Sequence, residues 1–429
     1  SERRRATHTS ALERPRPSDP PGFSCEAAMT GDHVTLLLGP AAAGKTEAAL
    51  AELARPRRGR ALLLLPGVLH RRRLLGRLRP IPRLRAGGFG YVARYVLRLA
   101  GEPVEVASEA TRRAVLRAEL GALASAGRLP LLGPVAAKGG VVVEALRLID
   151  ELRAADVPPG ALAAAGVGPY DADLAAAYGA YLAALGRHGL SDAAGLLARA
   201  RDALREGRAP GLRLALLVAD GFDQLSGVQL GLLAALAGRA ERALVTLTGE
   251  PGARPAHGRF ARTLAALRAA LPGARVEHLP PGEGLAAPLR QIERGLFEPA
   301  PPPPRDAGGA VTIVRAPDRE REVRAALRRA RALLLAGAPA ETVGVLYRSG
   351  ERYAPLVREV AVEYGLPVAV YEGLPLGEAP PVVALRELLA LPADGFPRRA
   401  LAESWRGLGA HEAAALLDRA GAGAGRGLP

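Results

Sequence analysis

The sequence predicts an α/β protein with two lobes, each built on a parallel sheet flanked by helices. Two observations lead to this prediction. Short apolar runs, each of the length of a buried strand, alternate with longer segments of helical periodicity. Four consecutive prolines, Pro301 to Pro304, then interrupt this alternation and are typical of a stiff extended connector.

The composition of the 429 residues excludes several classes of protein. With 49% hydrophobic residues, the chain has enough apolar side chains for two or three folded cores. Its longest apolar runs are strand-sized, as in Ala61 to Leu65, so no membrane span is expected. The single cysteine, Cys25, excludes an internal disulfide, a cysteine-rich zinc site and a four-cysteine iron–sulfur cluster within these residues. It favours a reducing, cytoplasmic location.

The formal net charge of +15 comes from 58 basic and 43 acidic residues. Only two of the basic residues, Lys45 and Lys138, are lysines, and asparagine does not occur. This bias suggests a GC-rich genome, so the arginine excess is partly a coding effect. A positive chain is attracted to DNA, but the charge alone does not separate DNA binding from the coding bias.

Residues 1–28 precede the only methionine, Met29, and predict a disordered basic extension. They contain Arg3, Arg4 and Arg5 and too few apolar side chains to offset the entropy of ordering. We expect Met29 to be the natural start, and a basic tail that touches DNA is the alternative. No apolar segment follows the arginines, so a secretory signal is not expected.

The most specific motif follows a predicted strand, His33 to Leu38. Gly39 to Thr46 reads Gly-Pro-Ala-Ala-Ala-Gly-Lys-Thr and leads into a helical pattern, Glu47 to Leu53. This is the P-loop pattern in its required context of strand, loop and helix. The alternative is a Gly/Ala-rich turn in which one of only two lysines falls by chance.

The P-loop residues have distinct expected roles. Gly39 and Gly44 let backbone N–H groups turn toward phosphate oxygens, and the helix N-terminus adds partial positive charge. We expect Lys45 to bind the β- and γ-phosphates of ATP and Thr46 to ligate Mg²⁺.

A later strand, Leu212 to Ala219, ends in Asp220, where P-loop motors carry a Mg²⁺-associated carboxylate. Such motors place a glutamate directly after it to activate water, but here Gly221 follows. Asp223 is the nearest carboxylate, and a shift of about 1 Å can already cost roughly 100-fold in rate. A further strand, Ala243 to Thr248, ends without the expected γ-phosphate-sensing glutamine. We therefore expect weak or absent ATP hydrolysis.

Two loops at strand ends are candidates for DNA binding. A strand over residues 60–65 is followed by a basic helix with Arg71 and Arg72, and a glycine-rich segment with Phe89 and Tyr91 leads into another helix. Arginines bind phosphates and aromatic rings stack on bases of single strands. The alternative is a solvated arginine face and core aromatic residues.

The first lobe is predicted to span residues 29–298 and to contain a helical insertion at about 108–206. The insertion is rich in Ala, Leu and Arg with helical periodicity. Within it, Tyr178, Tyr181 and Leu185 share one helical face, which is typical of a core.

A proline-rich linker is predicted at residues 299–309. Beyond it, Ala310 to Arg315 and Thr342 to Tyr347 have strand-like patterns, and Arg319 to Leu335 has a helical one. We expect residues 310–429 to begin a second lobe that is truncated, with the ATP site between the two lobes.

Four segments together resemble superfamily 1 helicases of the UvrD type, and more narrowly the AddB (RexB) subunits of AddAB helicase–nucleases. The Asp-Gly-Phe-Asp form of the acidic motif points to AddB. So does the absence of an adenine-reading glutamine upstream of the P-loop. The resemblance extends from about Met29 to Tyr371 and is strongest at the P-loop. The four segments are Gly39 to Thr46, Tyr181 to Asp192, Asp220 to Gln224 with Gln229, and Val343 to Arg348.

The resemblance implies two RecA-like P-loop lobes, with the chain as the N-terminal portion of an AddB-like subunit. It implies binding of ATP, Mg²⁺ and DNA by a helicase-like core that does not itself drive unwinding. An AddA-like helicase–nuclease subunit would be its partner in double-strand-break repair and recombination. Asp220 would support the metal, and Arg348 would approach the γ-phosphate, unless Arg348 is an ordinary surface arginine. In the family a nuclease with an iron–sulfur cluster follows, and none is visible here.

Two other functions fit the same residues. An autonomous UvrD-like DNA helicase would show DNA-stimulated ATP turnover. A non-enzymatic DNA-binding scaffold would use ATP only to order the interface between its lobes, and in that case a Lys45→Ala change would alter DNA binding or assembly.

Overall fold

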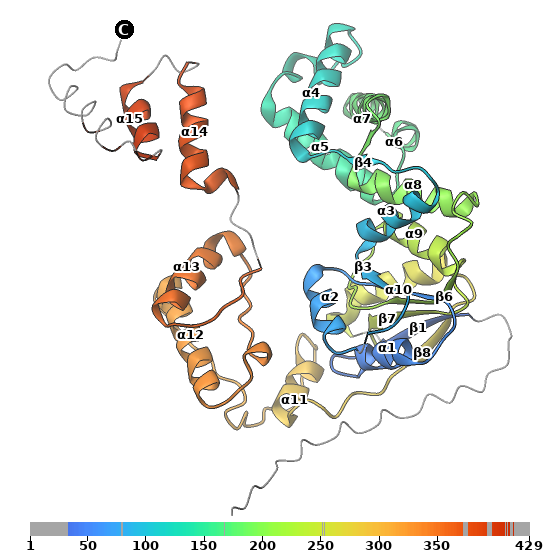
Figure 1. Cartoon of the computed structure of the whole chain (residues 1–429), viewed down its shortest axis with the longest axis vertical. Coiled ribbons are helices and arrows are strands. Elements are labelled where there is room, and N and C mark those ends of the chain that lie inside the picture. The colour runs from blue at the N-terminus through green and yellow to red at the C-terminus, as the bar shows by residue number, and fades with distance from the viewer. Residues whose placement is uncertain are drawn as a thin grey trace, which may run out of the picture. The chain divides into compact units, whose positions relative to one another are not determined.

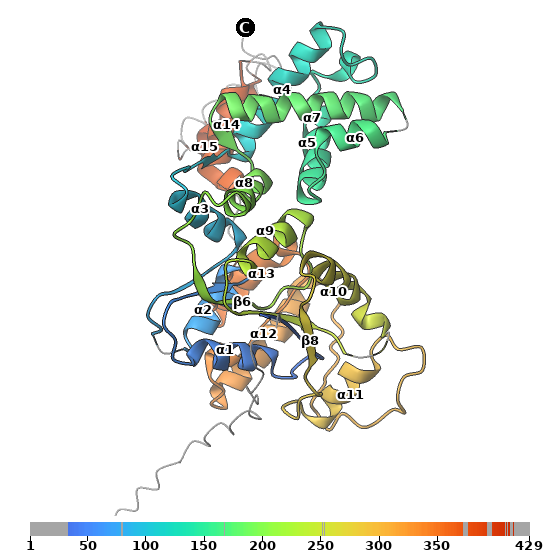
Figure 2. The same cartoon turned by 90° about the vertical axis from the view of Figure 1, so that its right-hand side faces the viewer.

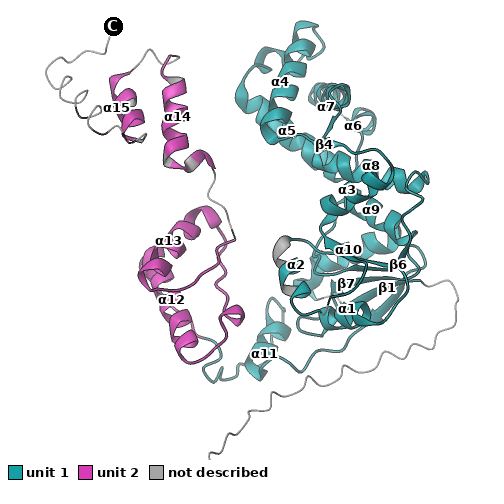
Figure 3. Cartoon of the chain, viewed as in Figure 1, with its two compact units in different colours: residues 1–311 teal, residues 312–429 magenta. Residues whose placement is uncertain are grey.

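The computed structural model of the protein describes most of the chain after its first 32 residues. The described residues are 33–407 without 79, 167, 251, 253, 372–375 and 393–396, together with 409, 411 and 415. The predicted extension at 1–28 and Met29 lie outside them. The chain divides into two compact units, Ser1–Val311 and Thr312–Pro429 (Figure 3). Their boundary lies just after the linker predicted at 299–309.

The first unit is α/β and contains a six-stranded sheet (Figure 1). The strand order is β3-β2-β6-β7-β1-β8, and every pairing is parallel. Leu36 lies opposite Val245, and Leu63 lies between Ala86 and Val218. The strands are β1 (Val34–Gly39), β2 (Arg60–Leu64), β3 (Leu84–Gly87), β6 (Leu214–Ala219), β7 (Ala243–Thr248) and β8 (Arg275–His278).

Helices cover both faces of the sheet, and alternate side chains of β2, β6 and β7 enter different apolar clusters. On β2, Leu62 and Leu64 belong to one cluster, and Ala61 and Leu63 to the other. A sheet buried on both faces explains why its inner strands read as continuous apolar runs. The first cluster includes α3 (Phe89–Leu99), α8 (Ala193–Arg205), α9 (Gly227–Ala237) and α10 (Gly258–Ala270), and the second includes α1 (Lys45–Ala54) and α2 (Val68–Leu75).

The four predicted strands of the first unit are confirmed as β1, β2, β6 and β7, with ends that differ by two residues at most. The strands β3 and β8 were not predicted. Both are short strands at the two ends of the sheet and carry charged residues, including Arg85, Arg275 and Glu277. A strand at a sheet edge does not need a continuous apolar run, so this signal is absent there.

The insertion gathers away from the sheet, as two perpendicular views show (Figure 1 and Figure 2). Its helices form a separate core that buries Tyr178, Tyr181 and Leu185, as predicted. The insertion predicted at about 108–206 differs from the structure in its strand content and in the packing of its last helix. A short parallel pair, β4 (Glu105–Val106) with β5 (Leu190–Ser191), includes part of it, and α8 packs against α3 and α9 instead. The insertion helices are α4 (Glu109–Ser125), α5 (Gly139–Ala154), α6 (Pro159–Ala165) and α7 (Pro169–Arg187).

The described part of the second unit is helical. The predicted helix over 319–335 is confirmed as α12, which packs on α13 through Leu327 and Val360. The strands predicted at 310–315 and 342–347 are not present, and no described residue of this unit belongs to a strand. A second sheet-based lobe therefore has no support from the described residues. The helices are α12 (Arg319–Leu335), α13 (Gly350–Glu363), α14 (Pro380–Ala390) and α15 (Arg398–Gly407).

Short 3₁₀ turns and one further helix complete the described secondary structure. The helix is α11 (Ala287–Gly295), which follows β8 in the first unit. The turns are η1 (Gly133–Val135), η2 (Pro255–His257), η3 (Ala340–Thr342) and η4 (Leu376–Glu378).

Candidate nucleotide-binding site

The P-loop connects β1 to α1 at the carboxyl edge of the sheet. Gly44 precedes the helix with a φ of +85°, a conformation in which a Cβ atom is strained. Gly39 is needed for another reason, because a Cβ there would lie 2.8 Å from the Cβ of Ala43. Each motif glycine thus permits a different part of the bend, and the first turn of α1 directs N–H groups toward the loop.

The Lys45 ammonium group is bonded to the loop itself. Its Nζ donates to the carbonyl oxygens of Gly39 at 2.8 Å and Pro40 at 2.6 Å. Burial lowers the pKa of Lys45, and the negative charges of Asp220 and Glu293 oppose that shift. A phosphate in the loop would replace two neutral carbonyl partners of the ammonium group by a charged one. Hydrogen bonds between two charged groups are stronger than those to a neutral carbonyl.

Asp220 at the end of β6 is 3% exposed and faces the P-loop. Thr46 Oγ1 donates to its Oδ2 at 3.1 Å, and Thr246 Oγ1 donates to its Oδ1 at 2.6 Å. The structure therefore brings together Lys45, Thr46 and Asp220 as the motifs predict. Thr246 was not predicted as part of the site, although a polar residue in the buried strand β7 is a signal that the sequence carries.

The pair of Thr46 and Asp220 fits a magnesium ion that is held mainly by phosphate and water. A hydroxyl and a carboxylate are hard oxygen ligands, and Mg²⁺ is usually bound by one or two protein groups together with substrate phosphates. No group of three or more His, Cys, Asp or Glu residues that could hold a metal occurs among the described residues. Thr46 and Asp220 could thus hold Mg²⁺ together with phosphate oxygens and water.

Position 221, where a water-activating glutamate would stand, has a backbone that favours glycine. Gly221 has a φ of +83°, and a Cβ there would lie 3.4 Å from Cδ2 of His70. Asp223, the next carboxylate, is directed elsewhere, since its Oδ2 pairs with Arg259 Nη2 at 3.1 Å. In the described turn after β6, no carboxylate side chain therefore faces the P-loop apart from Asp220.

An ion-pair network that the sequence analysis did not foresee lies near the P-loop. The Arg254 guanidinium group contacts Glu250 at 2.7 Å, Glu298 at 2.9 Å and Glu293 at 3.2 Å. Although burial opposes it, the hydrogen bonds to these carboxylates raise the pKa of Arg254. The network joins the segment after β7 to α11 and keeps Glu293 near Lys45.

The segment after β8 packs directly on the P-loop. Leu279 N donates to the Leu38 carbonyl oxygen at 2.7 Å. A Cβ at Gly282 would lie only 2.0 Å from the Ala42 carbonyl oxygen, so only glycine allows this approach. Contacts with the residues that follow β8 therefore stabilise the conformation of the P-loop.

The four DNA-binding candidates have different environments. Arg71 and Arg72 on α2 are exposed, and Tyr91 is 44% exposed. Phe89 is only 5% exposed and packs against Phe222 with ring centroids 5.4 Å apart. The Phe89 ring belongs to the core between α3 and the sheet, which favours the core alternative over stacking on a base.

Two other residues quoted for the resemblance have clear positions. Gln229 has a structural role, since its side chain and that of Ser226 form a capping box at the start of α9. Arg348 belongs to the second unit, lies just before α13 and is exposed. Its approach to a γ-phosphate stays a prediction.

No family model matches the sequence, and no curated protein matches it significantly. Within the described ranges, none of the helices combines the length and apolar character needed to cross a membrane. The interpretation of the candidate site therefore rests on the geometry of its residues.

Proposed function

We propose that the chain binds ATP and Mg²⁺ at the P-loop and binds DNA. It would act as the helicase-like, AddB-type subunit of an AddAB helicase–nuclease in double-strand-break repair and recombination. The observation that carries this proposal is the meeting of Lys45, Thr46 and buried Asp220 at the carboxyl edge of a parallel sheet. In parallel α/β proteins this edge is where phosphates bind.

Each residue of the site has a defined task in this proposal. Lys45 binds the β- and γ-phosphates, and the N–H groups at the start of α1 bind the phosphate oxygens. Thr46 and Asp220 would hold Mg²⁺, which neutralises phosphate charge when bound. Thr246 keeps the Asp220 carboxylate oriented by donating to it at 2.6 Å.

The same geometry supports nucleotide binding with little turnover. Gly221 carries no base, and Asp223 is paired with Arg259. Water activation needs a base within hydrogen-bond reach. Unwinding would then be driven by an AddA-like partner subunit in the cytoplasm, while this chain contributes DNA contacts through exposed basic residues such as Arg71 and Arg72.

A titration with a fluorescent ATP analogue and Mg²⁺ tests the nucleotide site. The chain contains only two lysines, so Lys138→Ala is a matched control for Lys45→Ala. Loss of hydrogen bonds to a charged group costs about 1.5–3 kcal/mol, so we expect Lys45→Ala to weaken binding roughly 10- to 100-fold. Exposed Lys138 has no contact with the site, and its removal is expected to leave the affinity unchanged.

Turnover measurements distinguish the alternative functions. We expect ATP hydrolysis by the wild-type chain to be no faster than that of Asp220→Asn, with or without DNA. DNA-stimulated hydrolysis that Lys45→Ala abolishes would favour an autonomous helicase. DNA binding and complex assembly that survive Lys45→Ala would count against a nucleotide-gated scaffold.

A further inference from the structure

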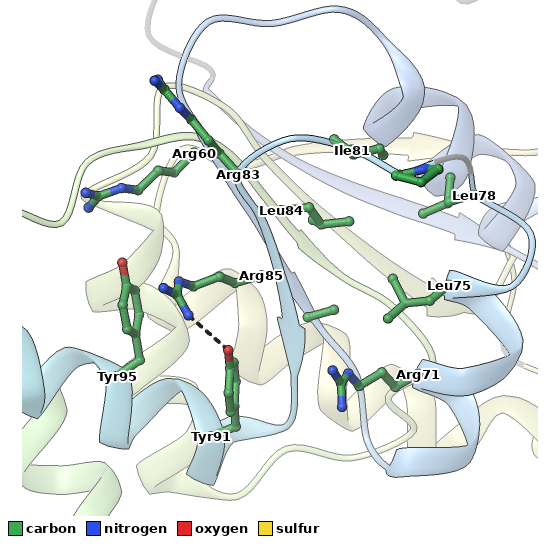
Figure 4. Close-up of a pocket in the computed structure, with 12 residues that line it drawn as sticks. Arg60, Arg71, Leu75, Leu78, Ile81, Arg83, Leu84, Arg85, Tyr91 and Tyr95 are labelled. Atoms are coloured by element: carbon green, nitrogen blue, oxygen red, sulfur yellow. Dashed lines mark hydrogen bonds between the residues drawn. The ribbon is translucent and has the colours of Figure 1, made fainter.

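A hollow lies beside β3, at the end of the sheet farther from β1, and shares no residue with the P-loop site. Figure 4 shows the side chains that line it. It has a volume of about 610 Å³ and is bounded by α2, α3 and the segment that joins α2 to β3. We call it the edge site. Its polar lining consists of Arg60, Arg71, Arg83, Arg85, Tyr91 and Tyr95.

The edge site is strongly basic. Four arginines line it, from β2, α2 and the start of β3, and no acidic residue does. None of the four has a carboxylate partner among the contacts of the described residues, whereas Arg77, just beyond α2, pairs with Glu47. Arg60 instead donates to the Gly211 carbonyl oxygen at 2.7 Å. Unpaired guanidinium groups in one hollow favour an anionic ligand, above all one with phosphates.

Two tyrosines on α3 flank one of these arginines. The Arg85 guanidinium lies 4.1 Å from the Tyr95 ring centroid, and its Nη1 donates to the Tyr91 hydroxyl at 3.2 Å (Figure 4). The cation–π contact and the hydrogen bond hold the charge in place without neutralising it. Tyr91 keeps 44% of its surface exposed, so a face or edge of its ring is available to a ligand.

The backbone conformation around Arg83 is also held in place by its neighbours. Arg83 has a φ of +62°, which is uncommon for a residue other than glycine and persists where the surroundings demand it. Its carbonyl oxygen accepts a hydrogen bond from Ala61 N at 3.2 Å, which ties it to β2. Apolar side chains, including Leu75 and Leu84, line the rest of the hollow.

We propose that the edge site binds single-stranded nucleic acid, with arginines on the phosphates and Tyr91 stacked on a base. Basic grooves with aromatic platforms are the general solution for binding single strands. This inference rests on the part of the proposed function that concerns DNA binding. It assigns that binding to a surface that does not include the P-loop. Of the two aromatic residues predicted to stack on bases, Phe89 and Tyr91, it keeps only Tyr91.

The arrangement favours a strand over two other anionic ligands. A free nucleotide would need a cluster of donors around one phosphate group, but Arg71 lies across the hollow from Arg60 and Arg83 (Figure 4), so the arginines suit several phosphates along a strand. An acidic peptide would satisfy the arginines but would leave the tyrosine faces without a matching group. Both ligands are therefore used as competitors in the test.

The first experiment measures the anisotropy of a labelled single-stranded oligonucleotide of about 12 nucleotides, a length that suits such sites. The variant is Arg83→Glu with Arg85→Glu. Its matched control is Arg262→Glu with Arg268→Glu, which makes the same charge change at exposed positions of α10. We expect the edge-site variant to raise Kd at least about tenfold and to reduce the salt slope by about one per lost phosphate contact. The control is expected to stay within about twofold.

The second experiment separates stacking from charge. Tyr91→Ala removes the ring, whereas Tyr91→Phe removes only the hydroxyl. We expect about a tenfold loss of affinity for Tyr91→Ala and a clearly smaller loss for Tyr91→Phe, because stacking depends on the ring face and Tyr91→Phe removes only the hydrogen bond from Arg85. Unlabelled oligonucleotide should displace the probe, while polyglutamate of equal charge and ATP should not.

The outcomes distinguish the inference from the proposed function. Normal binding of the ATP analogue by every variant would show that each is folded and that the P-loop is intact. Equal losses in the edge-site variant and its control would overturn the edge site while leaving DNA binding elsewhere. Displacement by polyglutamate or ATP as effective as by oligonucleotide would also overturn it. A wild-type chain that binds ATP but no single strand would overturn both this inference and the DNA-binding part of the proposed function.

Discussion

The two units contain apolar segments of the same kind but expose them very differently. In the first unit Leu36 on β1 is fully buried, while Ile313 and Leu346 in the second unit are 90% and 94% exposed. The segments resemble each other in sequence, but β1 has β7 and β8 beside it, and the others have no described strand as a neighbour. A strand exists only where other strands complete its hydrogen bonds.

The largest expected difference between the units is in core truncation. Leu36→Ala should lower the free energy of unfolding by about 2–5 kcal/mol, because it leaves a cavity in a packed sheet. Leu346→Ala should change it by less than about 0.5 kcal/mol, because its side chain has almost no contacts to lose. Urea unfolding of both variants measures the difference. Equal losses would mean that residues 343–347 are packed in solution, and the comparison would fail.

Loss of a single side-chain hydrogen bond should also destabilise the first unit more than the second, with smaller effects than core truncation. Thr246→Val leaves the Asp220 carboxylate without the 2.6 Å bond and should cost about 1–3 kcal/mol. Thr342→Val in the second unit removes a bond to the exposed Pro339 carbonyl oxygen, which water can replace, and should cost about 0.5 kcal/mol or less. Urea unfolding measures the stabilities. The ATP analogue provides a second readout, and only Thr246→Val is expected to weaken its binding.

Glycine substitutions test the backbone of the two units. Gly221→Ala should destabilise by about 1–2 kcal/mol, because its φ of +83° is costly for a residue with a Cβ atom. Gly344→Ala should be neutral or slightly stabilising, because a Cβ there meets only one atom, at 3.9 Å, and its φ is not in the strained range. Thermal unfolding would contradict this reasoning if Gly344→Ala were the more harmful change.

The last prediction concerns the buried phenol of Tyr181 in the insertion, whose ionisation affects stability only at alkaline pH. Burial raises the pKa of Tyr181 to about 12, while the hydrogen bond from Arg112 opposes the shift. An unfolded tyrosine ionises near pH 10, so between pH 10 and about 12 the unfolded state binds fewer protons than the native state. Stability should therefore fall with rising pH in this window. Unfolding midpoints at pH 8 and pH 11 should show a smaller fall for Tyr181→Phe than for the wild type.

Much of the first unit could be predicted because its signals are local. Alternating strand and helix patterns marked β1, β2, β6 and β7, and the P-loop motif marked Lys45 and Thr46. The edge strands β3 and β8 carried no such pattern, because charges occupy their exposed positions. The exposure of Phe89 could not be predicted either, since a glycine-rich loop with an aromatic residue looks the same whether the ring faces solvent or Phe222.

The sequence by itself determined which residues form the glycine-bounded loop between β1 and α1 and in what order the inner strands and helices follow one another. These features depend on spacing within a few residues. The tertiary structure alone decided that Thr46 would meet Asp220, which is 174 residues away, and that Thr246 would hold that carboxylate. It also decided that Arg254 would join Glu250 to α11 and that four arginines would line one hollow. Such contacts depend on the order of strands in the sheet, and no pattern of neighbouring residues encodes that order.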